Sequence, residues 1–409
     1  MDNLQSMFES ALVDSAARVF SDMLADKIEA QGLKLTSRER DRLLKRLQSD
    51  EAVDLRFRAW KWWDDAVIAV EWTDEDWALA DHRVQRLLDG ERIVELIART
   101  TDDTAEVLLR TLRRTWKTVS RNENRERRGF ETRLGARWGL GLDRLRMALS
   151  VAGECGEMAA NSASQDPEFS SPVLLDVLAH SHARACQITE EILILLSSGF
   201  ADGAMARWRT LHEIAVVTYV LGRHGEQMAQ SFIDHEIVES MKAARDYREC
   251  SDRLGYEPMS DSEYDEIRDA YDGVVRQYGK AFKTQYGWAA EALGSQKPSF
   301  RDLELEAGVD HLRGHYRLAS HNVHANPKGV FLKLGLMEES DVLLAGSSNV
   351  GLTDPGHGAA ISLLQVTATL ATMRPSLDAL VHLRILTRLV DEVGDLFIEA
   401  QQELEGDLG

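Results

Sequence analysis

Cysteine and proline are both scarce in this chain of 409 residues. The three cysteines, Cys155, Cys186 and Cys250, are odd in number and include no C-x-x-C pair, so neither a disulfide framework nor a zinc knuckle is indicated. We therefore expect reduced thiols, as in a cytoplasmic protein. Only seven prolines interrupt the chain.

The sequence also lacks long apolar runs and a surplus of positive charge. No run approaches the roughly 18 apolar residues that a membrane helix needs, and the first ten residues, MDNLQSMFES, have no apolar core of signal-peptide length. Lys and Arg number 48 against 68 Asp and Glu, which gives a net charge of −20. This charge opposes general binding to nucleic acid or anionic lipid, so any such contact needs a local basic surface.

What is present is typical of a soluble globular protein, with 44% hydrophobic and 28% charged residues. Apolar residues recur every three or four positions, which predicts an all-α protein, a helical bundle with long C-terminal helices. The Ser, Asn and Pro cluster at 161–167 is the best domain boundary. We expect an N-terminal helical domain at 1–160, a helical-bundle core at 166–358, and C-terminal helices at 359–409 that pack on the core or on a dimer partner.

Helices are expected along most of the chain. A Ser260-x-x-Glu263 box predicts one helix start, and Pro375 is suited to the first turn of the last helix. The segment 343–358 is glycine-rich and irregular, with a possible short hairpin. The predicted helices are 1–29, 37–47, a start at 73–76, 91–97, 104–119, 141–160, 174–198, 201–221, 225–249, 260–278, 359–373 and 376–403.

Tryptophan is concentrated near the N-terminus, where five of the nine fall within about 25 residues. Such a group can form a stacking platform for bases or a ligand. Packing in a core or an interface is the commoner reason for it. The five are Trp60, Trp62, Trp63, Trp72 and Trp77.

An arginine-rich segment breaks with the acidic average between residues 110 and 137. It holds ten basic residues against Glu123, Glu126 and Glu131. Arginine is suited to bidentate phosphate recognition, so the segment is a candidate RNA-backbone surface; a solvated helix or a surface that neutralises acidic groups would look the same. The candidate substrate-binding residues here are Arg121, Arg125 and Arg128.

The first candidate site lies on the predicted helix 201–221, which reads RWRTLHEIAVVTYVL from residue 207. From Leu211 onward it is apolar nearly all round, as in a central helix. Arg209 and Glu213 stand four apart and can meet on one helix face. Arg207 precedes this pair and His212 lies within it in sequence. Both are assigned to substrate binding.

A metal site on the preceding helix is conceivable, since imidazole and carboxylate groups are common ligands. Its ligands would be Asp176, His180 and His182. Positions 180 and 182, however, point to different sides of a helix. We therefore predict neither a metal nor a cofactor.

The second candidate site is HYRLASHNVHANPKG at 315–329. A helical stretch would place Arg317, Ser320, His321 and His324 within two turns, with Ser320 and His324 on one face. Arginine and histidine so placed can contact a phosphate and exchange a proton near neutral pH. Structural histidines that bond a carbonyl would look identical. We expect Arg209, Glu213, Arg317, Ser320 and His324 to be catalytic, and His321 to contact the substrate.

Three blocks give the chain a family resemblance: EEILILLSSGFADGA, RWRTLHE and YRLASHNVHAN, in this order. With them, residues 166–358 resemble the bacterial family of unknown function DUF5677. Its recognisable polar positions correspond here to Arg209, Glu213, Ser320 and His324.

A looser resemblance is to the HEPN superfamily of helical bundles, many of them metal-independent ribonucleases that act as dimers in toxin and phage-defence systems. Their motif is an arginine and a histidine separated by four to six residues. Arg207 to His212 and Arg317 to His324 fit this spacing.

Two main classes of function remain open, beside a third, a nucleotide or small-ligand pocket at the same site. The first is a HEPN-like endoribonuclease of a toxin or phage-defence system, a homodimer with His324 as acid or base and Arg317 on the phosphate. The second is a non-enzymatic sensor, scaffold or partner-binding protein, for example with an antitoxin or defence component as its partner. There the Arg-Glu and Ser-His couples would form a buried network that fixes helix register. Both depend on the two candidate sites meeting in the fold.

Overall fold

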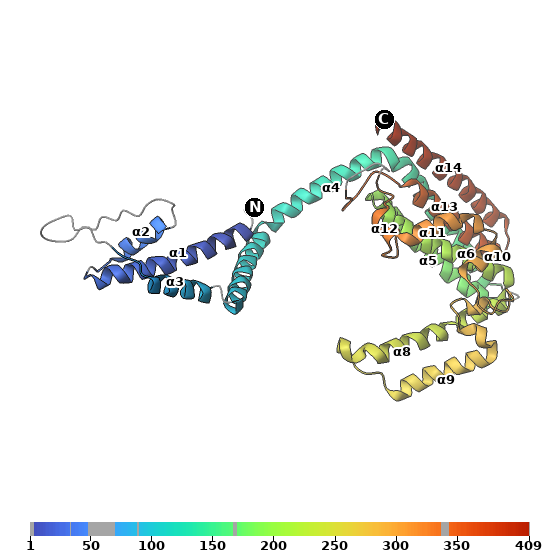
Figure 1. Cartoon of the computed structure of the whole chain (residues 1–409). Coiled ribbons are helices and arrows are strands. Elements are labelled where there is room, and N and C mark those ends of the chain that lie inside the picture. Colours follow the sequence, from blue (N-terminus) through green and yellow to red (C-terminus); the bar gives the residue numbers. More distant parts are fainter. Residues whose placement is uncertain are drawn as a thin grey trace. The chain divides into compact units, whose positions relative to one another are not determined.

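The computed structural model describes residues 4–32, 34–47, 70–87, 90–166, 170–336 and 343–408, and every regular element in these ranges is helical (Figure 1). The all-α fold class is therefore confirmed. The chain divides into two units, residues 1–122 and 123–409. The predicted boundary at 161–167 falls between two long helices and, as a domain boundary, stays a prediction.

The first unit contains α1 (Leu4–Ala30), α2 (Ser37–Leu47), α3 (Asp74–Leu87) and the start of α4 (Gly90–Ser164). Lys27 of α1 forms an ion pair with Asp76 of α3. Trp72 and Trp77 lie 5.4 Å apart between ring centroids, and each lies 6.0 Å from the ring of Phe20. These two tryptophans therefore pack within the unit; Trp60, Trp62 and Trp63 lie outside the described residues.

One continuous helix of 75 residues, α4, replaces the three helices expected at 91–97, 104–119 and 141–160. That prediction was wrong because nothing in the intervening residues stops the helix. Thr100–Asp103 and Asn122–Asn124 are helical. No proline occurs before Pro167, and a single glycine inside a helix costs only about 1 kcal/mol, too little to end it.

The second unit is built on the hairpin of α5 (Pro172–Ser197) and α6 (Ala201–His224). Gly199 joins them with φ +77°, and a Cβ there would lie 2.7 Å from the Ser348 carbonyl oxygen and from the Phe130 ring. Only glycine fits this corner. The backbone N–H of Ser348 also donates to the Gly199 carbonyl at 2.9 Å, so an irregular segment closes the turn.

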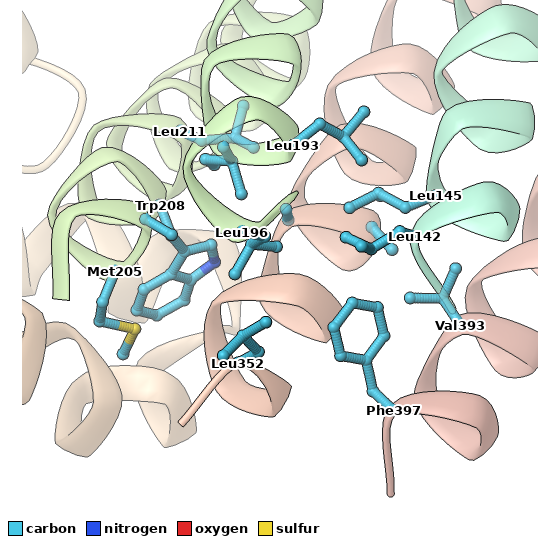
Figure 2. Packing of buried hydrophobic residues seen from close by; sticks show 14 of the residues in the cluster. Leu142, Leu145, Leu193, Leu196, Met205, Trp208, Leu211, Leu352, Val393 and Phe397 are labelled. Carbon is cyan, nitrogen blue, oxygen red and sulfur yellow. The ribbon is translucent and has the colours of Figure 1, made fainter. Parts of the chain in front are cut away.

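Apolar side chains from α4, α5, α6, α13 (Thr353–Ala371) and α14 (Leu377–Leu408) form the main core (Figure 2). Trp208 and Phe397 are its largest labelled side chains, 3% and 0% exposed. In α14, Leu386, Leu389 and Val393 are buried, whereas Leu380 is 57% exposed.

The remaining helices are α7 (Glu226–Asp234), α8 (Glu236–Leu254), α9 (Asp261–Tyr278), α10 (Phe300–Ala307), α11 (Arg313–His321) and α12 (Pro327–Phe331), with 3-10 turns at Lys280–Lys283, Gly287–Ala289 and Asp310–Leu312. The predicted Ser260/Glu263 capping box is present at α9. The helix expected at 225–249 is two, separated at His235, whose ring bonds the Thr284 carbonyl at 2.9 Å. The hairpin considered for 343–358 is wrong, since the described residues there contain no strand.

None of the helices in the described ranges has an apolar stretch long enough to span a bilayer.

Candidate functional site

The two candidate segments meet through Arg209 of α6. Its Nε donates to Ser320 Oγ of α11 at 3.1 Å, and one terminal nitrogen donates to the Tyr316 hydroxyl at 2.7 Å. The same guanidinium pairs with Glu213 at 3.0 Å. The predicted approach of an Arg-Glu couple to Ser320, over 100 residues away in sequence, is therefore present in the fold.

Tyr316 completes this group, which we call the polar network: Arg209, Glu213, Tyr316 and Ser320. The Tyr316 hydroxyl donates to Glu213 at 2.6 Å, and Ser320 Oγ donates to the Tyr316 carbonyl at 2.9 Å. The Arg209 guanidinium lies 4.8 Å from the Tyr316 ring centroid, a cation–π contact. Each Arg209 nitrogen is thus engaged within the protein.

Burial and charge shape the electrostatics of the polar network. Burial, together with the hydrogen bond to Glu213, raises the pKa of Tyr316 well above its ordinary value, so the phenol stays protonated. Burial and the nearby Glu213 carboxylate raise the pKa of Tyr286 to about 12. The side chains of Arg209 and Glu213 are 21% and 27% exposed, so one edge of the polar network reaches solvent.

Beneath the polar network lies a buried couple, His212 and Glu304, both with no exposed surface. His212 Nε2 lies 3.4 Å from Glu304, whose other carboxylate oxygen accepts from Arg313 at 2.7 Å. Burial lowers the pKa of His212 to about 4, so the ring is neutral and donates from Nε2. His212, predicted to bind substrate, lies between the rings of Trp208, Phe300 and Tyr316, out of contact with solvent.

Arg207 lies apart from the polar network. Two positions along a helix from Arg209, it extends toward α5, where its Nε lies 2.5 Å from Glu191. The structure does not bring Arg207 and Arg209 together.

Arg317 and His324 are both exposed. Neither makes a side-chain hydrogen bond or ion pair with the described residues. The helix α11 ends at His321, but the backbone N–H of His324 still donates to the Ser320 carbonyl at 3.2 Å, one turn further on, before Asn326 begins α12. The Asn326 side chain accepts from the Gly329 N–H at 2.8 Å, which caps the start of α12, and its amide nitrogen lies 3.0 Å from His321 Nδ1.

Arg121, Arg125 and Arg128 are exposed on α4. In the described part of the chain no hydrogen bond or ion pair joins Arg125 or Arg128 to the polar network. Arg137, at the end of the arginine-rich segment, instead forms an ion pair with Asp407 of α14, as expected of a base that neutralises an acidic group.

The conceivable metal ligands on α5 diverge. His180 is exposed and bonds Asp176, whereas His182 is buried with Nε2 3.2 Å from Thr367 of α13. Among the described residues, no cluster of three or more His, Cys, Asp or Glu side chains could hold a metal.

A cavity of about 540 Å³ opens between α6, α10 and α13, next to the site. Ala215, Tyr219 and Met373 line it with Arg223, which is paired with Glu306 at 3.4 Å. No member of the polar network lines this cavity, so the two are separate features of α6.

Sequence reasoning missed Tyr316, Arg313 and Glu304. Tyr316 stands four before Ser320, a spacing that could have placed it on the same face. Glu304 alternates with leucines in FRDLELEA and resembles a surface residue, so no local pattern marks it as buried.

Comparison with known proteins gives one family. Residues 175–341 match the model of a family of unknown function (DUF5677), and the matched range runs from α5 to α12 and includes the whole polar network. The resemblance expected from the three sequence blocks is thereby confirmed for this part of the chain. No curated protein and no solved structure matches.

Proposed function

We propose that the protein is a metal-independent endoribonuclease of the HEPN kind, with Arg317 and His324 as the groups that meet RNA. One observation carries the proposal. The 18 residues 311–328 contain four of the chain's 12 histidines, two arginines and a lysine but no acidic residue, in a chain of net charge −20. Within this strip Arg317, His324 and Lys328 are exposed. An anion would find here a local basic surface in a chain that is acidic overall.

The polar network has a positioning part in this proposal. Arg209 binds Ser320 and Tyr316 of α11 at once, so it fixes α11 on α6. Arg317 lies on α11 between Tyr316 and Ser320, the two residues that bond Arg209. The group that contacts phosphate is thus attached to a rigid element.

The chemistry needs few groups. His324, neutral, removes the proton of a ribose 2′-hydroxyl, and the oxygen attacks the adjacent phosphorus. The bond from phosphorus to the 5′-oxygen breaks, the protonated imidazole returns its proton to that oxygen, and the products are a 2′,3′-cyclic phosphate and a 5′-hydroxyl. Arg317 neutralises the charge that develops on the phosphoryl oxygens.

Arg121, Arg125 and Arg128 are assigned to contacts with the RNA backbone. Such contacts fix orientation without reading sequence and weaken steeply with salt. A cytoplasmic toxin or phage-defence role, a homodimeric enzyme and an antitoxin-like partner belong to the same proposal.

The test is cleavage of a labelled RNA panel by the purified chain in the presence of EDTA. We expect His324→Ala and Arg317→Ala to lose cleavage by at least about 100-fold, in the range of a lost acid–base group. The matched control is His315→Ala, an exposed histidine of the same strip. A 2′-deoxy substitution at the cut should block the reaction. An inactive wild-type chain, or His324→Ala as active as wild type, would refute the nuclease.

A second candidate is a non-enzymatic protein that binds a partner. The observation in its favour is that each nitrogen of Arg209 already donates within the polar network, as a structural arginine does. In this case the RNA panel stays uncut, whereas Glu213→Ala still lowers the melting temperature, since the network's role is structural.

A further inference from the structure

The first half of α4 presents an apolar stripe to solvent. Val94, Leu108, Leu112 and Val119 are 66%, 60%, 51% and 36% exposed, although a soluble helix normally buries such a face. Ala98, Thr101, Ala105 and Thr115 are also exposed. The stripe, residues 94, 98, 101, 105, 108, 112, 115 and 119, lies entirely within the first unit.

The spacing within the stripe alternates strictly between four and three residues. This is the a/d repeat of a coiled coil, here over more than three heptads. The basic side chains Arg110, Arg114 and Lys117 fall on the other side of the helix. The stripe is therefore continuous along the helix, and Ile97, Leu109 and Trp116 are exposed beside it.

Charge along α4 indicates what covers the stripe. Residues 91–106 carry five acidic and two basic side chains, whereas residues 107–122 carry five basic and no acidic ones. A parallel second copy would place like charges side by side. An antiparallel copy, centred between residues 106 and 107, places the acidic half of each helix along the basic half of the other.

The same antiparallel register matches side-chain size. It pairs Val94 with Val119, Ala98 with Thr115, Thr101 with Leu112, and Ala105 with Leu108. In the two central pairs a small side chain meets a leucine, as close packing of two helices requires.

We propose that α4 is the seam of a homodimer in which two copies of this stripe pair antiparallel. The seam lies outside the range that matches the family of unknown function. It does not rest on the nuclease proposal. The basic side chains on the back of the helix stay in solvent on both copies.

The first test measures the mass of the full chain by sedimentation equilibrium. We expect a dimer for wild type, and for Leu108→Glu a dissociation constant at least about tenfold higher, because each dimer would bury two unpaired carboxylates. Val107→Glu is the matched control. Val107 directly precedes Leu108, is 53% exposed and lies off the stripe. Because these side chains are exposed, circular dichroism should be unchanged in both variants.

The second test fixes orientation by disulfide cross-linking. Antiparallel pairing places residue 98 opposite residue 115 of the other copy and about 25 Å from residue 98 of that copy, at 1.5 Å rise per residue. The double variant Ala98→Cys/Thr115→Cys should therefore cross-link, and Ala98→Cys alone should give no more dimer than wild type with its native cysteines.

Several outcomes would overturn the seam. They are a monomeric wild type, equal weakening by Leu108→Glu and Val107→Glu, cross-linking by Ala98→Cys alone, or a monomer that loses binding to anionic vesicles when Leu108 is changed. The last result would assign the stripe to a membrane surface instead.

Discussion

Glu213 is the member of the polar network whose charge can be removed without changing the size of the side chain. It accepts from both Arg209 and Tyr316, at 3.0 and 2.6 Å. Glu213→Gln keeps the volume but removes the charge. We expect the free energy of unfolding to fall by about 1–2 kcal/mol, the lower part of the range for hydrogen bonds to charged groups, since the side chain is 27% exposed.

The measurement is urea unfolding at pH 7 beside Glu190→Gln, an exposed glutamate on α5. That control should change stability by less than about 0.5 kcal/mol. Equal effects of the two substitutions would mean that the polar network contributes nothing specific.

The sequence predicted that the segments of Arg209 and Ser320 meet, but not that Tyr316 takes part in the contact. Charged residues on an otherwise apolar helix need partners, and this pointed to the segment that contains Arg209. The identity of the partner depends on how α6 and α11 cross. For that reason Tyr316, and the pairing of Glu304 with His212 and Arg313, could not be read from spacing along either helix.

Among the helices, α4 shows how a single glycine can be either a requirement or a weakness. A Cβ on Gly141 would lie 2.8 Å from the buried ring of Phe397, whereas a Cβ on Gly139 would meet nothing within 4 Å. We expect Gly141→Ala to destabilise by about 1–3 kcal/mol through overpacking. Gly139→Ala should stabilise by about 0.5–1 kcal/mol, because alanine favours the helix.

Chemical denaturation of the two variants side by side checks this. Identical shifts in both would show that helix propensity alone acts at these positions, and that α4 does not approach α14 as closely as the structure has it.

Helix existence was more predictable than helix length. The α5–α6 hairpin and the α9 capping box were expected within a few residues, because apolar periodicity and capping residues act locally. The fusion of three predicted helices into α4, and the separation of α7 from α8 at His235, were not. In α4 no residue forbids continuation, whereas at His235 a tertiary hydrogen bond to the Thr284 carbonyl favours the break.

For the whole molecule, buried histidines predict a loss of stability in mild acid. Burial lowers the pKa of both His182 and His212 from 6.5 to about 4. Between these values the unfolded chain binds a proton at each site and the folded chain does not, so stability falls as pH falls from about 6.5 to about 4. Each histidine costs up to about 3 kcal/mol at the lower end.

Glu304, whose pKa is raised by burial, acts in the opposite direction and offsets part of this loss. The measurement is the free energy of unfolding against pH. His182→Gln should flatten the curve, and the exposed His180→Gln should leave it unchanged. A wild-type curve that is flat from pH 7 to 5 would contradict neutral buried rings.

The turn at Gly199 is bonded to a segment that is distant in sequence, and this contact gives a way to monitor the turn. The amide of Ser348 belongs to an irregular segment, yet it donates to the carbonyl of Gly199 in the turn between α5 and α6. In deuterium exchange it should therefore behave like a helical amide among fast-exchanging neighbours. The Ser348 amide therefore reports on the turn between α5 and α6. A ligand, a partner or a substitution that weakens this turn will make deuterium uptake at Ser348 faster.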